Sequence, residues 1–243
     1  MLSRRSKELA KELTDDRGAR ALELDAVPGW HPALLVALML SVDAAGSVLA
    51  ARHHELRGQG PLVVRAYLPL LCVNWGLLLY VCRVGRARSA FVELMGPSAF
   101  RASRALTDLA LAVVTALALM GGEAAWQLAF GNARNAAAGA LLPTTSAERA
   151  VWCAVAVSVG VSEEVVYRGY LTTELARFTG SAVAGVVGQA LLFAFAHGEQ
   201  GAAAVTRFFV YALGLGALAR ARRSLLPGIL AHVAVDLVAG LCR

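Results

Sequence analysis

The residues best suited to chemistry lie in three apolar segments of the chain. A segment at about 150–171 contains the run SEEVVYRG (residues 162–169), and two later segments each bring a histidine, His197 and His232. A charge at bilayer depth costs at least a few kcal/mol, so charged side chains there should face the protein interior and have partners. We therefore expect the three segments to meet at one polar, hydrolytic site.

Helical spacing assigns different roles to the two adjacent glutamates. Glu164 and Arg168 are four residues apart, so they share a helix face and can pair. Glu163 is rotated by about 100° from its neighbour, and Tyr167 follows it by four residues in a position to steer it. A glutamate removed from water is suited to proton transfer near neutral pH. We predict that Glu164 is architectural, whereas Glu163 is catalytic and points at His197.

The two histidines belong to short motifs of their own. His197 ends the run FAFAH (residues 193–197), and His232 is followed four residues later by Asp236, which could orient it and fix its tautomer. Taken singly, each residue has a structural explanation, as an interfacial histidine or as a satisfied polar pair. Burying all of them in three apolar helices costs much free energy unless they meet in a polar cavity. We therefore expect them to meet, and such a cluster indicates a functional site.

Other chemistries have weaker support. A serine nucleophile, Ser158 or Ser162 with His232 and Asp236, stays conceivable, but the chain has neither a Gly-x-Ser-x-Gly turn nor a His-Glu-x-x-His zinc motif. No Cys-x-x-Cys spacing occurs, so we expect buried free thiols rather than a zinc ribbon. Seven further polar residues are expected at interfaces or in interhelical hydrogen bonds: Asp43, Asn74, Asp108, Glu123, Gln127, Gln189 and Arg207.

Composition sets the fold class. Of the 243 residues, 58% are hydrophobic and 16% are charged, whereas soluble domains are about half apolar and about a quarter charged. We predict an all-α integral membrane protein, a bundle of about seven transmembrane helices around an intramembrane polar catalytic cavity. The expected spans lie at about 30–51, 61–82, 105–120 (extending toward 130), 150–171, 181–196, 202–219 and 225–241. The net charge of +6 reflects basic loops, and nucleic-acid binding is not expected.

The chain divides into a polar, amphipathic N-terminal segment (1–28), three helices with their loops (29–147) and a catalytic core (148–243). Most arginines and lysines lie in the N-terminal segment and in the loops after the second, fourth and sixth spans. This bias predicts a cytoplasmic N-terminus and an outer C-terminus. No cleavable signal peptide is expected at the start. Arginine greatly exceeds lysine and alanine is abundant, as in GC-rich bacteria, so we expect a bacterial inner membrane.

The three motifs, in this order and on separate spans, resemble those of the CPBP (CAAX protease and bacteriocin-processing) intramembrane protease family. They read Glu-Glu-x-x-x-Arg at 163–168, Phe-x-x-x-His at 193–197 and His-x-x-x-Asp at 232–236. The resemblance covers about residues 148–241 and extends to the Rce1-type prenyl-protein endopeptidases. It implies a helical bundle around a conical cavity and cleavage of membrane-anchored or C-terminal-signal-bearing proteins or peptides. A short, alanine- and arginine-rich member fits the myxosortase-like branch.

The resemblance also implies residue roles. Glu163 and His197 would activate the attacking water, while His232 and Asp236 would stabilise the oxyanion or bind water. Asp236 stands where some members have asparagine, and an ionised aspartate cannot donate to an oxyanion, so it would act through His232 or in its protonated form. The supporting residues would be Glu164, Arg168, Tyr167 and Phe193.

Metal dependence stays open at this point, because members of the family have been described both as metalloproteases and as glutamate-dependent enzymes. We favour the glutamic mechanism, which requires no cofactor. A zinc ion could alternatively be held by Glu163, His197 and His232.

Two other functions use the same residues. The bundle could be a non-catalytic immunity or scaffold protein of the same fold. It could also be a proton-coupled transporter with Glu163, His197 and His232 as a relay, although no inverted repeat is visible and the bundle is small.

Overall fold

The structure, a computed structural model, describes residues 30–39, 63–85, 94, 102–130, 139 and 141–242. All regular structure in these ranges is helical, with no strand, which confirms the predicted all-α class. Several predicted features lie outside the described residues: the N-terminal segment 1–28, Asp43 and the second half of the first span.

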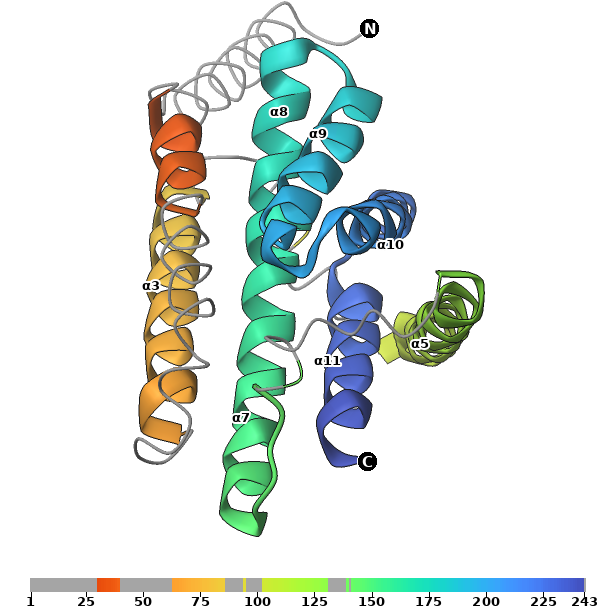
Figure 1. Ribbon diagram of the computed structural model, residues 1–243. Coiled ribbons are helices and arrows are strands. Elements are labelled where there is room, and N and C mark those ends of the chain that lie inside the picture. Colours follow the sequence, from red (N-terminus) through yellow and green to blue (C-terminus); the bar gives the residue numbers. More distant parts are fainter. Residues whose placement is uncertain are drawn as a thin grey trace, which may run out of the picture.

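A helix lies in each of the seven predicted spans (Figure 1). In chain order the elements are Trp30–Met39, the π-helix η1 (Val63–Tyr67), α3 (Leu68–Gly85), α5 (Ala102–Phe130), α7 (Ser146–Glu163), the π-helix η3 (Glu164–Leu171), α8 (Thr172–Thr179), α9 (Ala182–Phe195), the 3₁₀ turn η4 (Gly198–Gln200), α10 (Ala202–Arg222) and α11 (Leu226–Leu241). Among the described residues, three helices have the length and composition to cross a bilayer: Ser103–Phe130, Ser146–Thr179 and Ala202–Arg222. The protein is an integral membrane protein.

Local sequence signals fix the ends of the central helices. Thr145 caps α7: its hydroxyl accepts from the backbone N–H of Glu148, and the Glu148 carboxylate accepts from the backbone N–H of Thr145. Such a capping box satisfies donors that a helix start leaves free. Gly180, at φ 67°, ends α8 in the left-handed conformation, and Ser181 then caps α9. The chain reverses at this turn, so α9 returns along α8.

The rod formed by α7, η3 and α8 is the centre of the fold (Figure 1). It is 34 residues long, against the 22 expected for the fourth span. Two short helices cover it: α9 packs along α8, where Gly185 lies against the carbonyl of Thr172, and α11 packs along α7, where Gly160 lies against Val233. With 14 and 16 residues, these helices measure about 21 and 24 Å, less than the roughly 30 Å of a hydrocarbon core.

Helix directions agree with the predicted topology. Tyr67 meets Trp152 and Asn74 meets Ser162, so the chain runs in the same direction through η1–α3 and through α7. In contrast, α5 runs antiparallel to α10, because early residues of one helix contact late residues of the other. Spans two and four should indeed run the same way, and spans three and six opposite ways. Which end faces the cytoplasm stays a prediction.

Apart from Gln127, the described polar residues of the other spans link helices, as predicted. Asn74 bonds to Ser162, and Gln189 donates to the carbonyl of Ala212 at 2.9 Å. Asp108 and Glu123 of α5 pair with Arg222 and Arg207 of α10, and Gln127 donates to Glu123 within α5.

The four cysteines are free, as predicted, but the expectation that they are buried is wrong. Cys72 and Cys242 are exposed, and Cys82 and Cys153 are partly exposed. Cys82 packs with one side against the hydrophobic core, and Cys242 follows the last residue of α11.

Candidate active site

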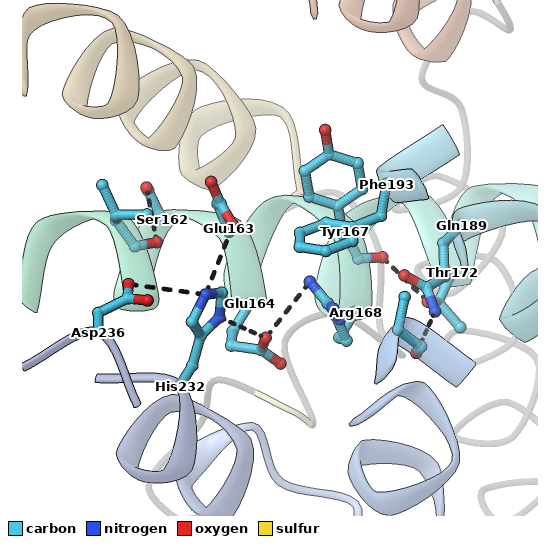
Figure 2. A network of polar contacts seen from close by, with 12 residues as sticks. Ser162, Glu163, Glu164, Tyr167, Arg168, Thr172, Gln189, Phe193, His232 and Asp236 are labelled. Atoms are coloured by element: carbon cyan, nitrogen blue, oxygen red, sulfur yellow. Dashed lines mark hydrogen bonds and ion pairs between the residues drawn. The ribbon is translucent and has the colours of Figure 1, made fainter. Parts of the chain in front are cut away.

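Three carboxylates surround one imidazole where α7 passes into η3 beside α11 (Figure 2). His232 Nδ1 donates to Glu164 Oε1 at 3.1 Å. On the other side of the ring, His232 Nε2 lies 3.7 Å from Glu163 Oε2 and 3.8 Å from Asp236 Oδ2. Arg168 Nη1 lies 3.3 Å from Glu164 Oε1, so the ion pair predicted from helical spacing is present.

Burial separates the two glutamates. The side chains of Glu164 and Arg168 are both 0% exposed. Glu163 is 21% exposed, and its neighbours Asp236 and His232 are 27% and 14% exposed. The inner pair therefore cannot reach a substrate directly, whereas the outer three side chains keep atoms at the surface of the protein.

The backbone around the cluster is unusual. Residues Glu164–Leu171 form a π-helix, and all eight of them are buried. π-turns are rare and often occur at functional sites. Two hydroxyls bond to carbonyls of this stretch: Thr172 donates to the carbonyl of Tyr167 at 2.9 Å, and Thr173 donates to that of Gly169 at 2.7 Å. An α-helix was expected here, yet residues four apart still meet, as Glu164 and Arg168 show.

The ring of Phe193 connects the three sequence motifs. The guanidinium carbon of Arg168 lies 4.1 Å from its centroid, in cation–π geometry. The rings of Tyr167, His197 and His232 lie at centroid distances of 5.0, 4.6 and 6.4 Å. Phe193 thus covers the buried guanidinium of Arg168 and contacts both His197 and His232.

His197 is held by its own helix. Its Nδ1 lies 2.8 Å from the carbonyl oxygen of Phe193. A carbonyl can only accept, so Nδ1 carries a hydrogen and Nε2 keeps a lone pair in the neutral ring. The ion-pair partner of Glu163 within the described part of the chain is His232, not His197. A joint role of Glu163 and His197 therefore stays a prediction.

Sequence reasoning missed the hydrogen bond between Glu164 and His232. Spacing had linked His232 only to Asp236, but Glu164 holds the Nδ1 atom. A small residue makes this approach feasible, because a Cβ at Gly228 would lie 2.9 Å from Glu164 Oε2. Gly228 precedes His232 by four residues and so shares its helix face, a signal available in the sequence. Trp152 adds a further link by donating to the carbonyl of Asp236 at 2.9 Å.

The two serines considered as nucleophiles face α3. Ser162 Oγ donates to Asn74 Oδ1 at 2.5 Å, and Ser158 Oγ accepts from the Trp75 indole at 3.2 Å. Among the described interactions, neither hydroxyl bonds to His232. The arrangement does not support a serine triad.

A zinc ion was predicted as an alternative to the metal-free mechanism. In the described ranges, no three His, Cys, Asp or Glu side chains are grouped so that they could hold a metal ion. The alternative of a zinc ion held by Glu163, His197 and His232 stays a prediction.

Comparison with known protein families gives a match at this site. Residues 145–238 match the family model described as Type II CAAX prenyl endopeptidase Rce1-like. These residues are thus similar to an Rce1-like domain. The match starts at the Thr145 cap of α7 and extends past Asp236, so it contains all three motifs, and it confirms the resemblance to the CPBP family. The myxosortase-like branch stays a prediction. No curated protein and no solved structure matched the chain.

The match to residues 145–238 supports a CAAX-type intramembrane endopeptidase in general terms. It contains the whole charged cluster, from Glu163 to Asp236. Helices α3 and α5 lie outside the matched residues, yet α3 packs on α7 and α5 packs on α11. Parts of the chain beyond the Rce1-like domain thus support both helices that carry the outer carboxylates.

Proposed function

We propose that the protein hydrolyses a peptide bond of a membrane-anchored or C-terminal-signal-bearing protein or peptide, using a water molecule activated by Glu163. One observation carries the proposal: Glu163 is partly accessible and lies 3.7 Å from Nε2 of His232, whose Nδ1 is bonded to the fully buried Glu164. A general base must be accessible to its substrate, and a neighbouring side chain must hold it in position.

In the proposed reaction, the Glu163 carboxylate takes a proton from water while the water oxygen bonds to the carbonyl carbon of the substrate. Negative charge then develops on the carbonyl oxygen. His232 Nε2, protonated and on the accessible side of the ring, donates to that oxyanion. The carbon–nitrogen bond breaks, and the proton held by Glu163 passes to the leaving amine.

Glu164 and Arg168 serve this reaction indirectly. Glu164 accepts from His232 Nδ1, which directs Nε2 toward Glu163 and Asp236. Arg168 compensates the buried carboxylate, because an unpaired charge at 0% exposure would be strongly destabilising.

Asp236 and His197 complete the proposed site. The Asp236 carboxylate lies 3.8 Å from His232 Nε2, where its charge stabilises the protonated ring and its oxygens can accept from water. This role suits an aspartate better than direct donation to an oxyanion. The free lone pair of His197 Nε2 provides a second acceptor for the attacking water.

The substrate is proposed to lie in or at the bilayer, because the site is carried by apolar helices. The Rce1-like family suggests a CAAX-type C-terminus, and the myxosortase-like branch suggests a C-terminal sorting signal. No cofactor is required, so cleavage should persist after treatment with a zinc chelator.

The test uses purified full-length protein in proteoliposomes with two probes, a farnesylated CAAX peptide and an unprenylated peptide with a C-terminal apolar helix. Glu163→Gln should lower cleavage of the accepted probe by at least about 10²-fold, the usual contribution of a general base. Glu123→Gln is the matched control, since Glu123 is another intramembrane glutamate, paired with Arg207 away from the cluster. It should cleave at the wild-type rate.

Full activity of Glu163→Gln would refute the proposal. Protection by the variant lacking both Glu163 and His197 would instead favour an immunity or scaffold role, and proton-coupled uptake into the vesicles would favour a transporter.

A further inference from the structure

We infer that Asn74, on α3, is a positioning residue for Glu163, an inference that rests on the function proposed above. Asn74 lies outside the residues that match the Rce1-like family. It is 8% exposed, and both ends of its amide are engaged. Oδ1 accepts from Ser162 Oγ at 2.5 Å, while Nδ2 donates to the carbonyl of Leu70 at 2.9 Å. This pairing fixes the amide in one orientation.

Ser162 directly precedes Glu163, at the point where α7 ends and η3 begins. The Ser162 hydroxyl is held by Asn74 on α3, so it anchors the last turn of α7 against a neighbouring helix. Any rotation of this turn about its axis carries Glu163 with it. A carboxylate about 6 Å from the axis moves by about 1 Å for a rotation of about 10°, and an error of about 1 Å in a reacting group can cost about 10²-fold in rate.

Ser158 and Ser162 are four residues apart, so they share the face of α7 that lies against α3. Ser158 Oγ accepts from the Trp75 indole, and one turn later Ser162 Oγ donates to Asn74 Oδ1. The opposite side of α7 is packed on α11 through a glycine, Gly160. Gly160 provides close approach but no directional bond, and the hydrogen bond from Trp152 of α7 to the carbonyl of Asp236 in α11 lies ten residues before Ser162. The bond between Asn74 and Ser162, which lies nearest to Glu163, is therefore suited to set the rotation of the last turn of α7.

Removal of Asn74 should leave the fold intact. The Ser162 hydroxyl also lies 3.2 Å from the carbonyl of Val159, so it keeps an acceptor when Asn74 is lost. No buried donor of α7 is left unpaired. Loss of Asn74 should therefore act on the placement of Glu163 rather than on stability.

The experiment measures kcat and KM for the accepted probe peptide in proteoliposomes, together with the Tm of each variant. Asn74→Ala should lower kcat about tenfold, with KM within about twofold of wild type and an unchanged Tm. Ser162→Ala should lower kcat equally, and the double variant should show no further loss, because both remove one contact. Ser162→Thr, which keeps the hydroxyl, should retain the wild-type kcat.

Trp75→Phe is the matched control. It removes the hydrogen bond to Ser158 one turn away, where Trp75 is 51% exposed, and should leave kcat unchanged. An unchanged kcat in Asn74→Ala, while Glu163→Gln is inactive, would overturn the positioning role and leave the proposed function standing. A fall in Tm with equal changes in kcat and KM would also overturn it. Full activity of Glu163→Gln would overturn both proposals.

Discussion

Two groups of charged side chains lie between apolar helices of this protein, and they differ in charge balance. Between α5 and α10, each carboxylate meets one guanidinium: Glu123 with Arg207, and Asp108 with Arg222. Between α7, η3 and α11, three carboxylates share one arginine and one histidine. In the first group, the charges of each pair cancel. The second has more carboxylates than the cations can neutralise.

The two groups also differ in contact length. Arg207 donates to Glu123 at 2.8 Å, and Arg222 Nε donates to Asp108 at 2.9 Å. Around His232, the contacts with Glu163 and Asp236 measure 3.7 and 3.8 Å. The short, balanced pairs link helices α5 and α10. Long contacts among surplus carboxylates leave lone pairs free for water, substrate and protons, which catalysis requires.

Replacement of His232 should have the largest effect on activity. His232→Ala removes the group that three carboxylates approach and the proposed oxyanion donor. Cleavage of the probe peptide in proteoliposomes should fall by about 10²–10³-fold, within the range of oxyanion and acid–base contributions. His31→Ala is the control, because His31 also bonds to a partner on another helix, the Tyr80 hydroxyl. Equal rates for the two variants would show that His232 has no catalytic role.

Replacement of Arg168 should have the largest effect on stability. Arg168→Met leaves Glu164 buried at 0% exposure without its cation, and breaking a buried ion pair in this way costs about 3–5 kcal/mol. The loss is measurable by denaturant unfolding in detergent. The double variant with Glu164→Gln should recover most of the stability but not the activity. An Arg168→Met variant as stable as wild type would show that Glu164 does not carry a buried charge.

The sequence predicted these features to different extents for physical reasons. The Glu164–Arg168 pair and the seven apolar helices depend on local spacing and local composition, and both were predictable. The bond between Glu164 and His232 joins residues 68 positions apart and depends on how η3 and α11 pack. Spacing within a segment contains no information about that packing.

Sequence alone could not separate the two charged groups either. Burying Glu123 and Arg207 in an apolar helix costs as much free energy as burying Glu163 and His232, because desolvation depends on charge and not on the function of the residue. Only the partners, their distances and their exposure distinguish them. The π-helix at 164–171 was also missed, since its residues contain no glycine or proline break before Gly169.

Gly228 tests the close approach of α11 to the buried glutamate, with an intermediate effect expected. Gly228→Ala puts a methyl group 2.9 Å from Glu164 Oε2, so the helices must shift. We expect a loss of about 1–3 kcal/mol in unfolding free energy, as for overpacking, together with slower cleavage. Gly214→Ala is the control, because a Cβ there meets no atom within 4 Å. Equal stability of the two variants would argue against tight packing at Glu164.

Arg222 tests the balanced group, where the expected effect is smallest. Arg222 donates through Nε and Nη2 to one oxygen of Asp108. Arg222→Lys keeps the charge but replaces this fork by a single ammonium group, so unfolding free energy should fall by about 1 kcal/mol or less. Cleavage should stay at the wild-type rate, because the α5–α10 pairs link helices without touching the cluster around His232. A tenfold loss of cleavage would mean that the balanced group also controls the site.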